Sequence, residues 1–274
     1  MAYTTSNTTT RSSSPTKTSE TPTTLSKPRI LCLHGGGVNS EVFRMQCRSL
    51  IKHLPAFRFV FADGPWFCEA GPGIVPVYED CGPFRRWLRW LPHQPETDDG
   101  SATEEIFYEI ERCKREDDDK GATGEWVGIL GFSQGAKVAA SLLYDQQIRE
   151  EKGLEVDTRY KFGVLTAGRN PLVSFGEYSR SEALVSAGQL SEGFVFEGTS
   201  PHILKLPTLH VHGLRDNGLH LHRRLLKQYC DPETSEVVEW DGDHRVPIKS
   251  TDVKPIKDWV YDIARKEGIP LRET

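Results

Sequence analysis

The sequence lacks an apolar run of the roughly 20 residues that a membrane-spanning helix needs. Its first residues also lack the apolar stretch of a secretory signal, so export is not expected. Positive charge is not in excess, because the net charge of the 274 residues is −5, and this argues against binding to nucleic acid. These absences predict a cytoplasmic protein whose partners are neither membranes nor nucleic acids.

Closely spaced cysteines are absent as well. The six cysteines are scattered and none forms a C-x-x-C pair. This pattern is typical of reduced thiols rather than of a disulfide framework or a zinc site. One isolated disulfide bond remains an alternative. His210 and His212 alternate on a predicted strand and could share a face, and His220 and His222 follow nearby. His-x-His pairs can bind zinc, but no cysteine partners or H-E-x-x-H helix accompany them. We therefore predict no metal and no cofactor.

Large apolar side chains are rare in residues 1–27, which are rich in serine and threonine. Such a segment buries too little surface to offset the entropy lost on ordering, so it is predicted to be a disordered tail. Arg11 and Lys17 would also fit an organelle-targeting segment, but an amphipathic Arg-rich helix is missing. Residues 28–274 are long enough for a single domain with a sizeable core.

Apolar patterns in this domain alternate between strand-like runs and helical spacing. We expect strands at 29–33, 57–61, 126–130, 162–165, 209–212 and 237–240, and helices at about 40–53, 102–113, 134–144, 219–229 and 253–266. Residues 116–119 are expected to form a solvated acidic turn. The alternation predicts an α/β fold, in which helices cover both faces of a mostly parallel sheet.

The pentapeptide Gly131-Phe132-Ser133-Gln134-Gly135 lies between a predicted strand and a predicted helix. This context fits the G-x-S-x-G turn, in which a strained backbone exposes the serine Oγ and the glycines leave room for the turn. The helix N-terminus then presents N–H groups and a positive dipole end to a developing oxyanion. Ser133 is the predicted nucleophile.

A serine hydroxyl is a weak nucleophile and needs a base. After such a turn, the acid and then the histidine follow in chain order. Asp216 and His244 match this order, and each follows the carboxyl end of a predicted strand, where ligands bind in open α/β sheets. Asp241 and Asp243 are alternatives for the acid, but their closeness to His244 in sequence would remove the usual geometry of separate loops.

An oxyanion hole needs two N–H donors. One is expected to be the backbone N–H of Gln134, and the other should come from the loop after the first strand, His34-Gly35-Gly36-Gly37. Gly36 is the first candidate and Gly37 the second, because glycine lets the backbone approach a substrate closely. A phosphate cradle is not predicted, since no Gly-Lys-Ser/Thr follows. His34 is expected to shape the turn that aims the glycines.

Two stretches, residues 64–100 and 168–203, do not fit the alternation of strands and helices. Long irregular connections are often lids or pocket walls, although they can also be tolerated surface insertions. Aromatic and arginine side chains interleave in the first of them: Trp66, Phe67, Phe84, Arg85, Arg86, Trp87, Arg89 and Trp90. They indicate either an apolar acyl pocket with a basic mouth for an anionic carrier, or a surface helix with its tryptophans on the core.

Four segments carry a resemblance to a known family. They are Leu33-His34-Gly35-Gly36-Gly37-Val38-Asn39-Ser40, Asp63-Gly64-Pro65, Gly131-Phe132-Ser133-Gln134-Gly135 and Asp243-His244-Arg245-Val246-Pro247. They resemble the FSH-type serine hydrolases, and the resemblance extends from Pro28 to the C-terminal helix. It implies an α/β-hydrolase fold with lid-like insertions and a triad of Ser133, Asp216 and His244. Asn217 departs from the proline or small residue that often follows the acid, which puts the shape of that loop in doubt.

The segment from His34 to Phe43 is most similar to the fungal branch found in polyketide gene clusters. This resemblance implies a stand-alone esterase or thioesterase of secondary metabolism. Its substrate would be an acyl ester, or a polyketide on the acyl carrier domain of a synthase, and it would use no cofactor. Two alternatives remain, a small-molecule binding module without catalysis and a structural partner of a synthase. An intact triad argues against the binding module.

Overall fold

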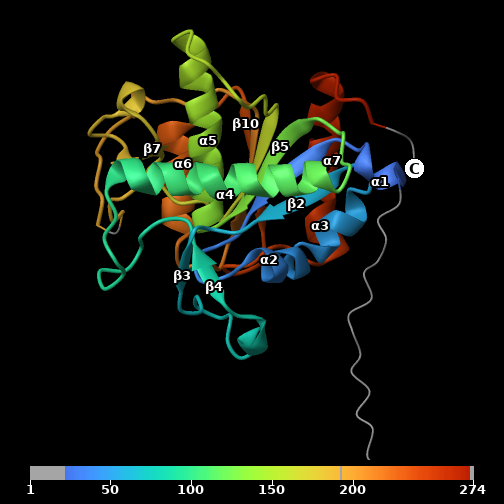
Figure 1. Cartoon of the computed structure of the whole chain (residues 1–274), viewed down its shortest axis with the longest axis horizontal. Helices are drawn as coiled ribbons and strands as arrows, with labels where there is room; N and C mark the ends of the chain where they lie inside the picture. The colour runs from blue at the N-terminus through green and yellow to red at the C-terminus, as the bar shows by residue number, and fades with distance from the viewer. Residues whose placement is uncertain (1–21, 192, 272–274) are drawn as a thin grey trace, which may run out of the picture.

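The computed structural model of the protein describes residues 22–191 and 193–271 (Figure 1). Most of the predicted tail, residues 1–21, lies outside the described residues. The described chain begins with a short helix, α1 (Pro22–Leu25), so regular structure starts ahead of the predicted domain boundary at residue 28. Within the described chain, no helix is both long and apolar enough to cross a membrane.

A six-stranded sheet, with the strand order β10-β9-β6-β5-β1-β2, forms the centre of the fold. The strands are β1 (Arg29–Leu33), β2 (Arg58–Ala62), β5 (Trp126–Phe132), β6 (Phe162–Thr166), β9 (Thr208–Gly213) and β10 (Ser235–Trp240). Every neighbouring pair is parallel, so all carboxyl ends meet at one edge. The inner strands are almost entirely buried, which explains their continuous apolar runs.

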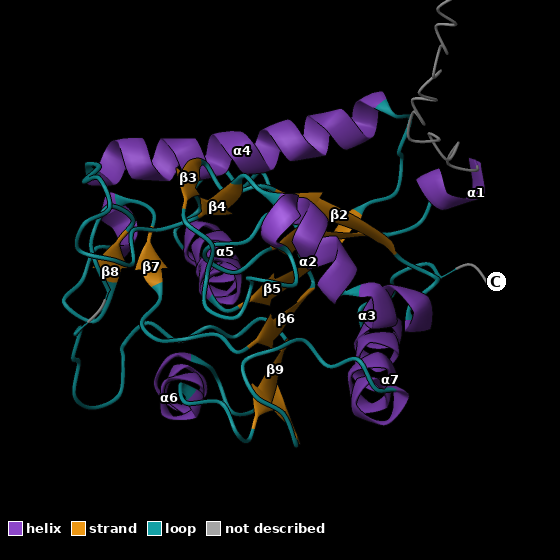
Figure 2. Ribbon diagram, turned by 90° about the horizontal axis from the view of Figure 1, so that it is seen from below, coloured by secondary structure: helices purple, strands orange, loops and turns teal. Residues whose placement is uncertain are grey.

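Helices cover both faces of this sheet, as predicted (Figure 2). α2 (Ser40–Gln46), α3 (Arg48–His53) and α7 (Ser250–Lys266) pack on one face, and α4 (Asp99–Asp119), α5 (Gln134–Glu151) and α6 (Leu219–Tyr229) pack on the other. Within β1, Leu31 and Leu33 join the core beneath α5, whereas Ile30 and Cys32 join the core beneath α7. Neighbouring side chains of a strand point to opposite faces, so one strand supplies both cores. The predicted α/β fold is confirmed.

The prediction of a solvated acidic turn at residues 116–119 is wrong, because these residues form the last turn of α4. Asp117 is only 2% exposed. Its Oδ1 lies 2.6 Å from Arg58 Nη2, and its Oδ2 lies 3.4 Å from Arg29 Nη1. The two guanidinium groups compensate the buried carboxylate, and both come from strands that are distant in sequence. A local run of acidic residues gives no sign of such partners.

The first insertion contains a hairpin of β3 (Trp66–Cys68) and β4 (Phe84–Arg86), joined through an arm that projects from the body of the molecule and includes η1 (Glu79–Cys81) (Figure 1). The proposed surface helix over its tryptophans is therefore wrong. Arg85 and Arg86 pack on aromatic rings, with the guanidinium carbons 4.3 Å from the ring centre of Phe67 and 4.9 Å from that of Trp66. Since Arg86 is buried, it does not form an open basic mouth.

The second insertion forms β7 (Val173–Ser174), η2 (Glu177–Ser179) and β8 (Val185–Ser186). Its two short strands pair with each other, and β7 and η2 lie against α5, the helix that follows Ser133 (Figure 2). Both irregular stretches therefore lie against the elements that carry the candidate site.

Candidate active site

Ser133 lies at the turn between β5 and α5, where its φ of 53° and ψ of −115° are a strained conformation for a residue with a side chain. Its N–H donates to Thr166 O at 2.8 Å, which fixes the turn against β6. A Cβ on Gly135 would overlap Leu33 O, and a Cβ on Gly131 would overlap the start of α5. Both glycines of the pentapeptide are therefore required by close backbone packing.

His244 lies between the other two candidate residues of the triad. Its Nε2 is 2.9 Å from Ser133 Oγ, and its Nδ1 is 2.6 Å from Asp216 Oδ2. Burial alone would raise the pKa of Asp216, but hydrogen bonds from His244 and from the Gly218 N–H outweigh it and lower that pKa to about 2. An ionised Asp216 accepts a hydrogen bond from Nδ1–H, which keeps the imidazole proton on Nδ1 and leaves Nε2 free to accept the serine proton.

The loops after β9 and β10 bring Asp216 to His244 by packing backbone against backbone. Arg215 N–H donates to Gly242 O at 2.8 Å, and a Cβ on Gly213 would overlap the carbonyl oxygen of Asp243. The alternative acids point elsewhere: Asp243 pairs with Arg245 at 2.6 Å and Asp241 with Arg215 at 3.4 Å. The geometry therefore favours Asp216, on its separate loop, over both of them.

The glycine loop after β1 lies against the turn at Ser133. A Cβ on Gly35 would be 3.5 Å from Ser133 Cβ, and one on Gly36 would be 3.5 Å from the side-chain amide of Gln134. Gly37 N–H already donates to Arg85 O at 3.0 Å. Among the described residues, the N–H groups of Gly36 and Gln134 have no hydrogen-bond acceptor. They are thus available to an oxyanion, whereas Gly37 N–H is not.

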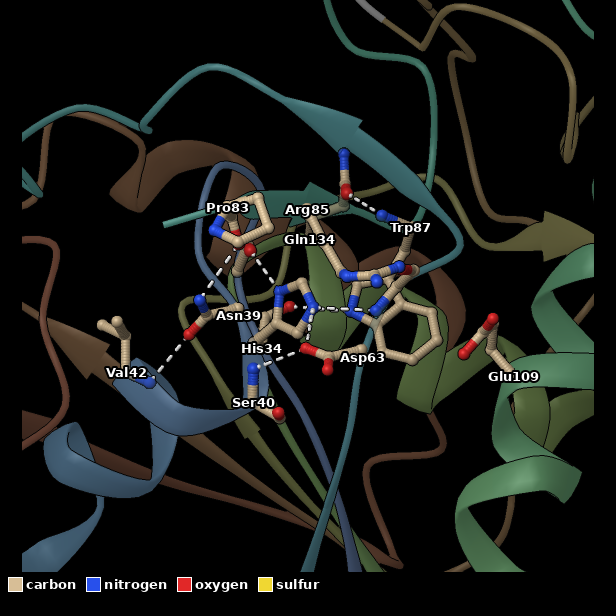
Figure 3. A network of polar contacts seen from close by, with 12 residues as sticks. His34, Asn39, Ser40, Val42, Asp63, Pro83, Arg85, Trp87, Glu109 and Gln134 are labelled. Carbon is tan, nitrogen blue, oxygen red and sulfur yellow. Dashed lines mark hydrogen bonds and ion pairs between the residues drawn. The ribbon is translucent and has the colours of Figure 1, made fainter. Parts of the chain in front are cut away.

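His34 holds the start of this loop, as Figure 3 shows. Its Nε2 accepts the Gly64 N–H at 2.9 Å, which leaves the proton on Nδ1 to be donated to Gly35 O at 2.7 Å. Trp87 Nε1–H donates to His34 O at 3.0 Å. Burial lowers the pKa of His34 to about 4, so the ring stays neutral and keeps this tautomer. The first insertion is therefore attached directly to the loop that it borders.

Metal-ligating side chains gather beside the same residues. Asp216, His222 and His244 offer ligand atoms within 4.8 Å of one another. Ligands on a tetrahedral zinc ion lie about 3.3 Å apart when each bond is about 2.0 Å long, so the 2.6 Å hydrogen bond from Asp216 to His244 does not fit an ion between them. The His210 ring contacts His212 edge to face, and the His212 ring contacts His222. Neither His210 nor His212 belongs to the group of three ligand atoms, and the rings of His210, His212 and His222 are buried.

In the sequence, His222 stood out only as a histidine near the His210 and His212 pair, and Lys137 did not stand out as a site residue. His222 lies on α6 with its Nε2 3.8 Å from Asp216 Oδ2, and Lys137 is a buried cation one turn after Ser133. The only sequence signal for Lys137 is a lysine on the otherwise apolar first turns of a helix.

Comparison with known proteins shows the family of the chain. The model of the family described as serine hydrolase (FSH1) matches residues 23–256. Esterase citA of Monascus ruber is 50% identical over 251 residues, which cover 90% of this chain and 96% of that protein. Esterase pigG of Monascus ruber is 47% identical, covering 94% of this chain and 99% of that protein. Esterase dbaE of Emericella nidulans is 48% identical, covering 90% and 94%.

Among solved structures, acyl-protein thioesterase 2 of Zea mays aligns over 87% of this chain and 94% of its own, with 14% identity and a TM-score of 0.49. The family match spans the whole central sheet, and the sequence relatives cover nearly the full chain. The family match and the sequence relatives confirm the resemblance seen in the sequence. The chain therefore belongs to the FSH1 family of serine hydrolases.

Proposed function

We propose that this hydrolase is a carboxylic esterase or thioesterase that works through an acyl-Ser133 intermediate. The observation that carries the proposal is the bridging position of His244, whose two ring nitrogens contact Ser133 Oγ at 2.9 Å and Asp216 Oδ2 at 2.6 Å. A nucleophile, a base and an orienting acid in hydrogen-bond contact are the requirements for acyl transfer from an ester or thioester.

In the first half of the proposed reaction, Ser133 Oγ attacks the carbonyl carbon while His244 Nε2 accepts the hydroxyl proton. Asp216 stabilises the imidazolium that forms, and the N–H groups of Gly36 and Gln134 donate to the oxyanion. The tetrahedral intermediate collapses when His244 returns the proton to the leaving oxygen or sulfur. Water then attacks the acyl-Ser133 carbonyl by the same steps, and the acid product leaves.

The substrate class follows from the resemblance and from the relatives. The relatives at 47–50% identity are named as esterases, and the sequence resembles the fungal branch found in polyketide gene clusters. We propose that the chain releases a polyketide from the acyl carrier domain of a synthase, or trims an ester of the product, in the cytoplasm. Oxygen and sulfur esters pass through the same oxyanion, so the site serves both.

A fluorophosphonate probe tests the nucleophile directly. The wild-type protein should be labelled, and Ser133→Ala should abolish labelling and lower kcat on short-chain esters by about 10⁴-fold or more. Ser250→Ala, which changes an exposed serine at the start of α7, is the matched control and should behave as wild type. Labelling that persists in Ser133→Ala would show that another residue is the nucleophile.

A panel of esters and acyl thioesters separates the enzyme from the two alternatives. Tight binding without turnover across the panel would favour a binding module. Restoration of product release in cells by the Ser133→Ala protein would favour a structural partner of a synthase.

A further inference from the structure

Lys137, in the second turn of α5, is a buried cation without a counter-charge. It is 4% exposed, and within the described part of the chain its Nζ forms no hydrogen bond and no ion pair. Lys114 is a useful comparison, because it is also buried but its Nζ lies 2.6 Å from Glu111 Oε1. Burying an unpaired ammonium is unfavourable, and here burial, followed by the positive charge of Arg169, lowers the pKa of Lys137 to about 7. Packing alone gives no reason for a lysine at this position.

The direction of the Lys137 side chain follows from its place in the helix. Side chains of an α-helix lean toward the N-terminus, and residues four apart share a face. Lys137 is four residues after Ser133, and its N–H donates to Ser133 O at 3.1 Å. The long side chain therefore extends along α5 toward the turn that carries Ser133.

The second insertion covers this face of α5. A Cβ on Gly168 would lie 3.1 Å from Ala136 Cβ, and Ser141 Oγ accepts the Val173 N–H at 2.8 Å. The loop between β6 and β7 thus passes over the helix on both sides of Lys137, and Figure 2 shows β7 beside α5 in the view along that helix. The Lys137 side chain is therefore largely covered by the helix of the nucleophile and by the insertion, while its Nζ keeps some accessible surface.

The same loop contributes a second cation, Arg169. A Cβ on Gly218 would lie 2.9 Å from Arg169 Nη2 and 3.2 Å from Asp216 Oδ1, so the guanidinium group flanks the loop of the proposed catalytic acid. Arg169 is exposed, and its side chain forms no ion pair or hydrogen bond with any other described residue. Two cations that lack anionic partners are therefore neighbours, the largely buried Lys137 on the helix that follows Ser133 and the exposed Arg169 beside the loop of Asp216.

We propose that Lys137 and Arg169 bind a carboxylate on the acyl chain of the substrate. The inference rests on the proposed function, because it adds a specificity site to the same acyl-transfer centre. A substrate carboxylate would supply the missing counter-charge and form charge-assisted hydrogen bonds with both cations. These bonds are stronger where little water is present, as around the largely buried Lys137 side chain. The acyl part is the favoured partner because it stays bonded to Ser133 at the head of α5 after the leaving group departs.

Two p-nitrophenyl esters of equal acyl length test this site in the full-length protein. p-Nitrophenyl glutarate ends in a carboxylate, whereas p-nitrophenyl pentanoate ends in a methyl group. The wild type should have the higher kcat/KM for the glutarate ester. Lys137→Met should lower the ratio of the two kcat/KM values by about 10- to 100-fold, the effect expected for one lost charge-assisted hydrogen bond. Arg169→Met should lower the ratio in the same direction.

Lys152→Met, at the opposite end of α5, is the matched control and should leave the ratio unchanged. A wild type without preference for glutarate, or a ratio that Lys137→Met does not alter, would overturn the inference while ester turnover itself stands. Failure to cleave either ester, together with the absence of fluorophosphonate labelling, would instead count against the proposed function.

A stability measurement distinguishes the proposed binding role of Lys137 from a purely structural role. Removal of an unpaired buried ammonium should raise the melting temperature in Lys137→Met while the preference for glutarate is lost. Should that variant not fold, inhibition of pentanoate-ester turnover in the wild type decides the question. Free glutarate should inhibit at lower concentration than free pentanoate, and equal inhibition would contradict the site.

Discussion

The side chain of Gln134 accepts the backbone N–H of Trp87 at 2.7 Å, which joins the residue after Ser133 to the first insertion (Figure 3). The same Oε1 accepts the Leu88 N–H at 3.1 Å, and Nε2 donates to Leu88 O at 3.0 Å. On the other side of the site, Gly37 N–H donates to Arg85 O. Both proposed oxyanion donors therefore belong to segments that this insertion holds in place.

Gln134→Ala should lower kcat, because it releases the segment at Trp87 and Leu88 from the turn. The proposed oxyanion N–H of residue 134 remains, but its position is no longer fixed, and a loss of about tenfold or more in kcat is expected. Three backbone groups lose their partner, which should also lower the free energy of unfolding by about 1–3 kcal/mol. Steady-state kinetics and urea denaturation measure the two effects.

Gln146→Ala is the matched control for this variant. Gln146 lies on the same helix, and its amide also binds a backbone N–H and C=O, those of Tyr160, at 2.8 and 3.1 Å. It should reduce stability by a similar amount and leave kcat unaltered. Equal kcat values for the two variants would show that the Gln134 bonds are structural only.

Gly37→Ala should abolish activity, because a Cβ at this position would overlap the backbone of Gly71. Gly37 also has a φ of 72°, which residues with a side chain rarely adopt. The displaced loop would move the Gly36 N–H away from Ser133. Gly153→Ala is the control, since its φ is 66° and nothing lies within 4 Å of the new Cβ. That variant should cost only about 1 kcal/mol of stability and retain activity, as denaturation and ester assays can show. An active Gly37→Ala protein would contradict the proposed role of this loop.

The sequence predicted the central sheet and its helices well, because buried parallel strands and amphipathic helices leave strong local patterns. The helix predicted at 219–229 has the same first and last residues as α6. The helix predicted at 40–53 is instead two helices, α2 and α3, which meet at Cys47. The candidate triad of Ser133, Asp216 and His244 could also be predicted, since the α/β-hydrolase fold prescribes this chain order.

Features that depend on contacts between residues far apart in the sequence could not be predicted. Arg86 resembles a solvated surface residue in sequence, but it is buried against Trp66. The burial of Lys137 could not be predicted either, because it is caused by an insertion that begins more than thirty residues later in the chain. Charged side chains in irregular segments acquire their environment only from tertiary packing, so local polarity cannot predict it.

Asp117→Asn should strongly destabilise the protein without changing the chemistry at Ser133. Its carboxylate compensates the buried guanidinium groups of Arg29 and Arg58, and removing one partner of a buried ion pair typically costs about 3–5 kcal/mol. Urea denaturation of Asp117→Asn should show this loss, while kcat measured at low temperature stays near that of the wild type. Asp119→Asn, an exposed position in the same helical turn, should have little effect on stability. Equal stability of the two variants would mean that the ion pairs of Asp117 do not contribute to the free energy of unfolding.

Four buried histidines should make the protein sensitive to acid. Burial is the largest cause of the lowered pKa in each: about 4 for His34 and His212, and about 3 for His210 and His222. The unfolded chain binds protons with the ordinary histidine pKa of 6.5, so it gains more protons than the folded state as the pH falls below 6.5. Stability should therefore decrease from pH 6.5 toward pH 4, with each histidine contributing up to about 1.4 kcal/mol per pH unit.

Urea denaturation at a series of pH values between 7 and 4 measures this dependence. Asp216 acts outside this window, because its lowered pKa of about 2 contributes stability that is lost only in stronger acid. His210→Leu removes one buried imidazole that lies away from Ser133 and should reduce the slope by about one proton. A wild-type stability that stays constant down to pH 4.5, or a slope that His210→Leu leaves unchanged, would show that these rings take up protons in the folded state. The row of histidines would then be open to water rather than sealed beneath the proposed catalytic acid.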